Sequence, residues 1–303
     1  MNETTSTIFA IKRYALHDGP SIRTTIFFKG CPLACHWCHN PEGIDFKISI
    51  VTLTGKCIGC GECVDNCRES ALQITDKGIC RNIDNCSHCQ TCIETCPALV
   101  HEATGYKMTT DELLNEIKKD LPFYDQSGGG VTISGGEPLS QPKSLSALLK
   151  RCGLLGIHRT VDTSGFAPTD TLMRIAEHTD LFLIDLKIMD NERHLQYTGV
   201  PNDLILHNLQ ALSENGQSIR VRIPLIPGVN DDEKNIRATG SFVAACKGIQ
   251  GIDILPYHSS ARTKYTKLGL VYNAQHFTSP TQQEITKVFE LLKHYISDVR
   301  IGG

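Results

Sequence analysis

Cysteine is crowded into one short part of this chain, and that crowding constrains the fold more than any other feature. Twelve of the 14 cysteines lie between residues 31 and 96 of a 303-residue sequence. The pattern C-x2-C-x2-C-x3-C occurs twice within residues 57–96. In a chain of this length so dense an array indicates metal ligands, because disulfide frameworks are typical of small secreted domains. The sequence therefore predicts a small unit built around metal.

The repeated spacing is that of bacterial ferredoxins with two [4Fe-4S] clusters, in which the fourth cysteine of each run binds the other cluster. One cluster then takes Cys57, Cys60, Cys63 and Cys96, and the second takes Cys86, Cys89, Cys92 and Cys67. Both clusters would be fully ligated and suited to carrying electrons. Zinc ribbons also use paired C-x2-C elements. Two complete runs with Pro97 after the last favour iron–sulfur, although Arg68 replaces the proline that often follows the first run.

A third group of cysteines lies upstream and is one ligand short. Cys31, Cys35 and Cys38 have the spacing C-x3-C-x2-C in "GCPLACHWCHNPEG". Three thiolates would leave one iron of a four-iron cluster without a protein ligand. Catalytic metal sites keep such an open position, whereas structural sites have every position filled by the protein. We expect neither His36 nor His39 to fill that position. The remaining cysteines, Cys80, Cys152 and Cys246, are expected to be structural.

Outside residues 50–103, β-rich runs alternate with amphipathic helical stretches. The predicted strands are residues 23–30, 130–136, 158–165, 181–187, 219–226 and 251–257. This alternation predicts a parallel α/β domain. Its first two strands flank the cysteine repeat. We therefore expect a discontinuous large domain, residues 1–49 and 104–303, with an inserted ferredoxin-like α+β domain at residues 50–103.

Polar residues lie within or directly after the predicted strands, near the edge where parallel strands end, which is where barrel enzymes carry their functional groups. After the three-cysteine loop come Glu137 in "SGGEP", Asp162 in "DTSG", Asp185 and Lys187 in "DLK", Arg222 and His258. The Glu137 carboxylate suits a cationic amino group, and Gly135 and Gly136 would let the backbone approach a ligand closely. Taken alone, "SGGEP" and "DTSG" could also be ordinary turns.

Together these motifs resemble the radical S-adenosylmethionine superfamily, and within it the glycyl radical enzyme activating enzymes, relatives of pyruvate formate-lyase activating enzyme. The resemblance covers nearly the whole chain outside the insert. The matching stretches are "DGPSIRTTIFFKGCPLACHWCHNPE", "GGGVTISGGEPL", "DTSGF", "LIDLK", "RIPLIPGVND" and "ILPYH". The resemblance implies a partial (β/α)6 TIM-like barrel that carries the inserted ferredoxin-type domain.

The resemblance also implies the cofactors. S-adenosylmethionine would bind the open iron of the cluster on Cys31, Cys35 and Cys38, giving three [4Fe-4S] clusters in all. Glu137 would hold its amino group, while Lys187, Arg222 and His258 would face its carboxylate and nucleoside. A monovalent cation would bind nearby to Asp162, Thr163, Asp185 and the backbone carbonyl of Leu183.

One motif departs from the family pattern. Asp18 in "HDGPSIR" matches a position near the entering glycine loop of a protein substrate, but Ser21 replaces the usual second glycine of "DGPG". If this position requires a positive φ, serine is disfavoured there. We expect a different loop geometry in that case.

The implied activity is reductive cleavage of S-adenosylmethionine to methionine and a 5′-deoxyadenosyl radical, which takes hydrogen from a backbone glycine of a partner enzyme. Flavodoxin or ferredoxin would supply electrons, with the insert serving as a relay or as a docking element. Relatives with such an insert serve enzymes such as glycerol dehydratase, choline trimethylamine-lyase, isethionate sulfite-lyase or 4-hydroxyphenylacetate decarboxylase, and not pyruvate formate-lyase. Two alternatives stay open, a radical enzyme acting directly on a small molecule or other peptide, and an electron-transfer polyferredoxin.

Charge and hydropathy limit the partners and the cellular location that we expect for this chain. A net charge of −3 and a pI near 6.4 give no broad basic field, so we expect no nucleic-acid partner. No run of 18 apolar residues and no secretory leader are present, which predicts a cytoplasmic protein without a membrane span. Because oxygen destroys glycyl radicals, the resemblance also implies an anaerobic host.

Overall fold

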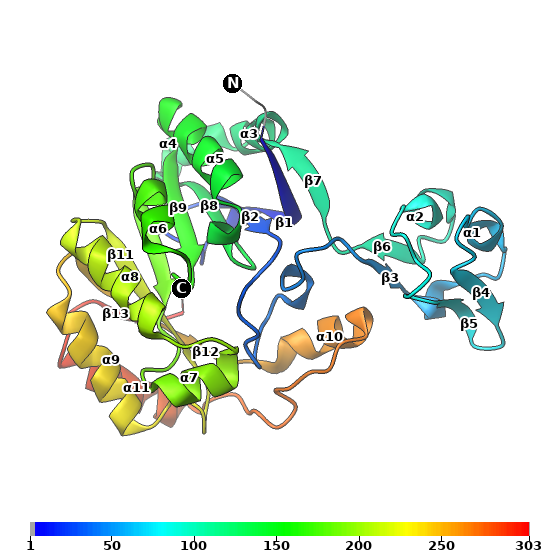
Figure 1. The fold of residues 1–303 in the computed structure, drawn as a ribbon. Helices are drawn as coiled ribbons and strands as arrows, with labels where there is room; N and C mark the ends of the chain where they lie inside the picture. Colours follow the sequence, from blue (N-terminus) through cyan, green and yellow to red (C-terminus); the bar gives the residue numbers. More distant parts are fainter. Residues whose placement is uncertain (1–3, 303) are drawn as a thin grey trace.

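One nine-stranded sheet forms the frame of the computed structural model, which describes residues 4–302. Its strand order is β13-β12-β11-β10-β9-β8-β2-β1-β7 (Figure 1). The strands are β1 (Thr5–Ala15), β2 (Arg23–Phe28), β7 (Tyr106–Thr109), β8 (Gly130–Gly135), β9 (His158–Thr163), β10 (Leu181–Asp185), β11 (Ile219–Leu225), β12 (Ile249–Pro256) and β13 (Val299–Ile301).

The six predicted strands are the six central ones, β2 and β8 to β12, and each pairs in parallel with the next. This confirms the predicted fold class, a partial barrel of parallel strands. Three further strands were not predicted. Strand β1 runs antiparallel to β2, β7 runs antiparallel to β1, and β13 adds to β12 in parallel.

Helices follow most of the parallel strands, and most of these helices cover one face of the sheet. They are α3 (Thr110–Lys118), α4 (Leu121–Ser127), α5 (Pro142–Leu154), α6 (Thr169–Ala176), α7 (Asn191–Thr198), α8 (Asp203–Glu214), α9 (Glu233–Ala245), α10 (Arg262–Leu268) and α11 (Gln282–Lys293), with the 3-10 turns η1 (Pro41–Gly43), η3 (Pro138–Ser140) and η4 (Ser259–Ala261). Helices α7 and α10 are the exceptions and lie by the three-cysteine loop. Both α3 and α11 begin with a capping box, at Thr109 and Thr281, which satisfies the first free backbone amides.

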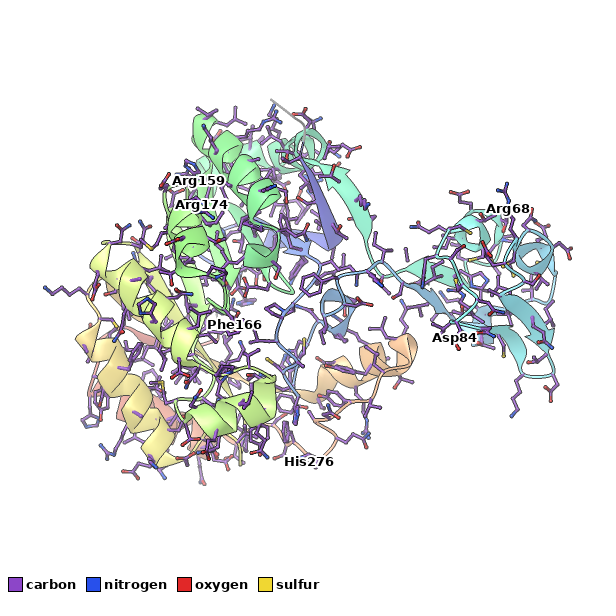
Figure 2. All side chains as sticks on the ribbon, in the orientation of Figure 1. Arg68, Asp84, Arg159, Phe166, Arg174 and His276 are labelled. Atoms are coloured by element: carbon purple, nitrogen blue, oxygen red, sulfur yellow. The ribbon has the colours of Figure 1, made fainter. Side chains whose placement is uncertain are left out.

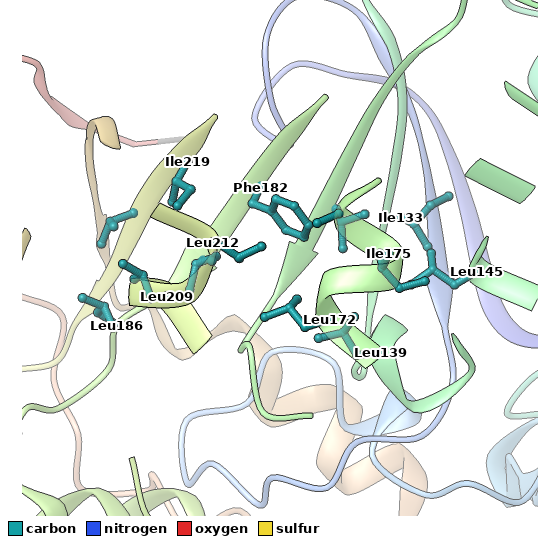
Figure 3. Packing of buried hydrophobic residues seen from close by; sticks show 14 of the residues in the cluster. Ile133, Leu139, Leu145, Leu172, Ile175, Phe182, Leu186, Leu209, Leu212 and Ile219 are labelled. Atoms are coloured by element: carbon teal, nitrogen blue, oxygen red, sulfur yellow. The ribbon is translucent and has the colours of Figure 1, made fainter. Parts of the chain in front are cut away.

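The main core lies between the sheet and these helices. Figure 3 shows Ile133 and Phe182 of the sheet facing Leu145, Ile175 and Leu212 of α5, α6 and α8, and all five are fully or almost fully buried. Because successive side chains of a strand point to opposite faces, the intervening residues line the other side. There Ser134 and Arg222 both contact Asp162, and Thr132 accepts a hydrogen bond from Arg23. The inner face of the partial barrel is therefore polar.

The segment from 50 to 103, called the insert below, stands beside the barrel (Figure 1). It contains β3 (Ile50–Thr52), η2 (Thr54–Lys56), α1 (Glu62–Asp65), β4 (Leu72–Thr75), β5 (Gly78–Arg81), α2 (Thr91–Thr95) and β6 (His101–Ala103). Strands β3 and β6 pair as a ribbon next to the barrel, and β4 and β5 form a hairpin. Figure 2 shows Arg68 and Asp84 of the insert far from Arg159 and Arg174 of the barrel.

The insert has a core of its own, and its two halves repeat in structure. Six of its side chains form a separate buried cluster that includes Leu72, Ile79 and three cysteines. The amides of Ala71 and Val100 point to the sulfurs of Cys67 and Cys96, which are equivalent positions of the repeat. The insert boundaries, 50 and 103, stay a prediction.

Candidate active site

The three-cysteine loop follows β2 at the carboxyl edge of the parallel strands. Cys31, Cys35 and Cys38 are half-buried free thiols. Burial raises the pKa of Cys31, and the nearby charge of Glu137 raises it further. Burial likewise raises the pKa of Cys35, opposed by the ammonium group of Lys187. Cys31 and Cys35 therefore lie near Glu137 and Lys187, which follow β8 and β10.

Several elements hold this loop in place. The amides of Ala34 and His36 donate to the carbonyls of Thr198 and Tyr197 at the end of α7, at 2.7 and 3.0 Å. On the other side, Lys264 Nζ of α10 donates to the carbonyl of His39 (3.0 Å), to Asn40 Oδ1 (3.2 Å) and to Glu42 Oε1 (2.7 Å). His39 and Asn40 therefore help to shape the loop through their bonds with Lys264.

Gly135 and Gly136 allow the end of β8 to press against the start of the three-cysteine loop. Gly135 has φ +126°, and a Cβ on it would lie 2.2 Å from the carbonyl oxygen of Phe28. A Cβ on Gly136 would lie 2.3 Å from the carbonyl oxygen of Gly43 and 2.6 Å from that of Gly30. In this structure the close approach is to the chain itself; approach to a ligand stays a prediction.

Glu137 is 1% exposed and ties the "SGGEP" loop to the "DTSG" loop. Its Oε1 accepts hydrogen bonds from the amide of Leu139 (3.1 Å) and Thr163 Oγ1 (2.6 Å). Its Oε2 accepts from the amide (2.9 Å) and hydroxyl (2.5 Å) of Ser164. Burial raises the pKa of Glu137, and these four donors oppose that rise. Sequence reasoning did not find Ser164.

Two ion pairs lie at the ends of β9, β10 and β11. Arg222 is 3.0 Å from Asp162 Oδ2, which also accepts from Ser134 Oγ at 2.8 Å. Lys187 Nζ donates to Asp185 Oδ2 at 2.6 Å. Burial lowers the pKa of each cation, but the carboxylates outweigh it and the net pKa of both rises. Among the predicted ligands of the monovalent cation, Asp162 and Asp185 thus each already have one carboxylate oxygen bonded to a protein side chain. Leu183 pairs with Asp162 in the sheet register, and the cation stays a prediction.

Asp18 reaches into the polar interior of the barrel. Its Oδ2 accepts from Thr25 Oγ1 at 2.7 Å, and its carbonyl accepts from Thr132 Oγ1 at 2.6 Å. Its carboxylate helps to raise the pKa of Arg222. Ser21 adopts φ +63°, so this position does require a left-handed backbone, and serine accepts it.

Sequence reasoning missed the side chain that holds this loop. Arg23 is 0% exposed and donates to Thr132 Oγ1 (2.6 Å) and to the carbonyl of Pro20 (3.1 Å). A charged residue inside a predicted buried strand was the available signal, because such residues are almost never fully buried unless they are paired.

His258 lies apart from the charged group. It is exposed, its Nδ1 is 2.7 Å from Ser260 Oγ, and its ring lies 4.3 Å from that of His39. It therefore flanks the three-cysteine loop. No bond to Lys187 or Arg222 joins it to the site in the described part of the chain.

The first predicted cysteine set of the insert surrounds a single hollow. Cys57, Cys60, Cys63 and Cys96 line a space of about 290 Å³, including its open side. Across residues 4–302, no three His, Cys, Asp or Glu side chains converge as they would on one metal ion, and the cluster on these four cysteines stays a prediction. In the second set, Cys86 and Cys89 act on the pKa of Cys92, so these three lie close together. Cys67 stands at the equivalent end of the first run.

Comparison with known proteins agrees with this arrangement. A sequence profile of the radical SAM superfamily matches residues 78–238, and a profile of the 4Fe-4S binding domain matches residues 50–73. The trans-4-hydroxy-L-proline dehydratase activating enzyme of Clostridioides difficile is 37% identical over 98% of this chain and 99% of its own length. The chain belongs to the glycyl radical enzyme activating enzymes. The choline trimethylamine-lyase activating enzyme of Oleidesulfovibrio alaskensis is 38% identical over 97% of this chain and 97% of its own length.

A solved structure supports the same assignment. A domain of pyruvate-formate lyase-activating enzyme from Bacteroides vulgatus is 39% identical, covers 58% of this chain and 99% of its own, and has a TM-score of 0.50. This activating enzyme is therefore a radical SAM oxidoreductase with a 4Fe-4S binding domain. No helix within residues 4–302 is long and apolar enough to cross a membrane.

Proposed function

We propose that this activating enzyme generates a glycyl radical in a partner enzyme of the dehydratase or lyase class. When bound, the open cluster and S-adenosylmethionine supply one-electron cleavage of the sulfonium to methionine and a 5′-deoxyadenosyl radical, which takes a hydrogen atom from a backbone glycine of the partner. Two of its relatives are named for activating trans-4-hydroxy-L-proline dehydratase and choline trimethylamine-lyase. These names support a partner that is a dehydratase or a lyase acting on C–C, C–N, C–O or C–S bonds.

The observation that carries this proposal is the meeting of three free thiols with buried charged groups at one edge of the sheet. Lys187 acts on Cys35, and Glu137 acts on Cys31. Lys187 and Arg222 now pair with Asp185 and Asp162, and either cation could also bind the carboxylate of a ligand. Because the four donors to Glu137 already use its lone pairs, a ligand's amino group would displace one of them. A polyferredoxin scaffold would have no use for these charges.

The insert supports delivery of electrons from a flavodoxin or ferredoxin to the open cluster. Helix α10 connects the two regions. Lys264 of α10 bonds the three-cysteine loop, and Lys267, one turn later, pairs with Glu102 of the β3–β6 ribbon. In our proposal the eight insert cysteines hold two closed clusters, and α10 fixes their position relative to the barrel.

The decisive test is anaerobic reconstitution, then incubation with S-adenosylmethionine, a reductant and purified candidate partners, followed by electron paramagnetic resonance. We expect a glycyl doublet with one dehydratase or lyase. Formation of 5′-deoxyadenosine without a glycyl signal from any such partner would indicate direct action on a small molecule or another peptide. Absence of S-adenosylmethionine binding would indicate an electron carrier.

Iron analysis tests the assignment of cysteines. Three clusters predict about 12 iron atoms per chain, at four per cluster. Cys31→Ala should abolish S-adenosylmethionine cleavage and retain about 8 iron atoms, those of the two closed clusters. Cys246→Ala is the matched control, since this half-buried free thiol lies on the barrel outside every predicted ligand set. It should leave both the iron content and the cleavage unchanged.

A further inference from the structure

His101, which begins β6, lines the hollow of the first cysteine set and carries a buried polar atom without a partner. The side chain is 2% exposed and lines the same hollow as Cys57, Cys60, Cys63 and Cys96. Its Nε2 is buried and makes no hydrogen bond. Buried polar groups almost always have a partner, so an orphaned ring nitrogen in the wall of a predicted cofactor site requires an explanation.

A neighbouring arginine determines which ring nitrogen carries the proton. Arg81 NH2 lies 2.9 Å from His101 Nδ1. A guanidinium group only donates hydrogen bonds, so Nδ1 must be the acceptor and the proton of the neutral ring lies on Nε2. Thr52 Oγ1, 3.2 Å from the same Nδ1, also lies on that side of the ring. The unpartnered Nε2, on the opposite side of the ring, is therefore an N–H donor.

Arg81 also contacts the second cysteine set. Its NH2 group lies 3.5 Å from Cys92 Sγ, within hydrogen-bond distance of a sulfur, and its NH1 donates to the carbonyl of Ile50 at 2.8 Å. One guanidinium thus touches a predicted ligand of one cluster and, through His101, the site of the other. Neither residue belongs to the predicted ligands.

We propose that His101 donates a hydrogen bond from Nε2 to the cluster held by Cys57, Cys60, Cys63 and Cys96, and that Arg81 joins this histidine to the second cluster through Cys92. The inference rests on the two insert clusters of the proposed function. A donor stabilises a cluster more strongly after reduction, because the cluster then carries an additional negative charge. His101 therefore raises the reduction potential of the first cluster, and Arg81 raises both potentials.

The test is a redox titration of the reconstituted full-length enzyme, followed by electron paramagnetic resonance. The S-adenosylmethionine-binding cluster is recognised by its response to that ligand, which leaves two waves for the insert. We expect His101→Leu to make reduction of one insert cluster about tenfold less favourable, a shift of about 59 mV for a one-electron couple. His101→Gln, which keeps an N–H donor, should restore most of it. Arg81→Met should lower both insert potentials, while Lys77→Met, a charge removed at an exposed turn, should lower neither.

The outcomes separate this inference from the proposed function. Iron near 4 atoms per chain in the wild-type enzyme would mean that the insert holds no clusters, and the proposed function would lose its relay. Iron near 12 with potentials unmoved in His101→Leu would overturn the inference alone. If His101→Leu fails to assemble, pulsed resonance of wild-type enzyme labelled with ¹⁵N-histidine decides. A histidine nitrogen coupled to a reduced insert cluster, and lost in His101→Gln, supports the hydrogen bond; no such coupling refutes it.

Discussion

Ser21 shows how a single residue can be strained by its place in a loop. Its φ of +63° lies in the left-handed region, which costs an L-residue with a Cβ roughly 1–2 kcal/mol. The strained residue belongs to the turn that brings Asp18 into the polar interior of the barrel, where its carboxylate raises the pKa of Arg222. Serine at this position therefore adopts a left-handed backbone at a cost that glycine would not have.

Replacing Ser21 with glycine should stabilise the protein. Glycine removes the left-handed strain but gains freedom in the unfolded chain, so we expect a net increase of about 1 kcal/mol in the free energy of unfolding. Chemical denaturation measures this. Ser21→Ala is the control, since it keeps the Cβ and should show no gain. An equal gain in both variants would contradict the strain.

Gly136→Ala should damage the three-cysteine loop. The new Cβ would meet the carbonyl oxygens of Gly43 and Gly30 at 2.3 and 2.6 Å, and Gly30 directly precedes Cys31. Backbone cannot yield as a flexible side chain does, so we expect iron to fall from about 12 to about 8 atoms per chain and S-adenosylmethionine cleavage to be lost. Gly55→Ala, where a Cβ meets nothing within 4 Å, should retain both. Full iron and activity in Gly136→Ala would mean that the loop adjusts freely.

At the scale of elements, the sequence predicted the six parallel strands because each is a β-rich run between helical patterns. It did not reveal β1, β7 and β13. The last two are short, and β1 alternates imperfectly because Lys12, Arg13 and Tyr14 are all exposed. The strand-end rule did locate Glu137, Asp162, Asp185, Lys187 and Arg222. It could not reveal Ser164 or Lys264, because a hydroxyl group in another loop or an ammonium group on a distant helix becomes a partner only after folding.

Strand β1 is fastened to the barrel by Asp120, which is 1% exposed. Arg13 of β1 donates from Nε to both carboxylate oxygens at 3.0 Å, and Thr24 of β2 donates to Oδ2 at 2.5 Å. Burial raises the pKa of Asp120, but the bonds from Arg13 and Thr24 outweigh it and the pKa falls below its usual value. One carboxylate thus joins two strands at the start of α4.

The stability that Asp120 contributes should depend on pH. A carboxyl whose pKa is lowered on folding stabilises the protein above its unfolded pKa of about 3.9, and this contribution is lost as pH falls through the lower folded value. We expect Asp120→Asn to cost about 1–3 kcal/mol at pH 7, because it leaves buried donors poorly paired. The difference from wild type should shrink below about pH 4, where wild-type Asp120 takes up its proton. Urea denaturation at pH 7 and pH 3 measures both; a difference that does not change with pH would contradict this role.

At the scale of the whole molecule, the barrel and the insert bury separate cores. No residue of the insert belongs to the main buried cluster of the barrel, and the insert's own cluster lies entirely within residues 63–100. The two are connected by the β3–β6 ribbon and by the ion pair of Lys267 with Glu102. An exposed ion pair of this kind contributes about 0–1 kcal/mol. The barrel should therefore fold without the clusters of the insert.

The β3–β6 ribbon offers a way to remove the part of the insert that would hold the two clusters. Thr52 of β3 pairs with His101 of β6, so an Asn-Gly turn in place of residues 53–100 would close a two-residue hairpin. We expect the shortened enzyme to unfold cooperatively, to hold about 4 iron atoms at the open cluster, and to cleave S-adenosylmethionine with dithionite. With reduced flavodoxin or ferredoxin, cleavage should be lost, because the relay is gone. Equal rates with both reductants would show that electrons reach the open cluster directly, and loss of folding would show that the barrel depends on the insert.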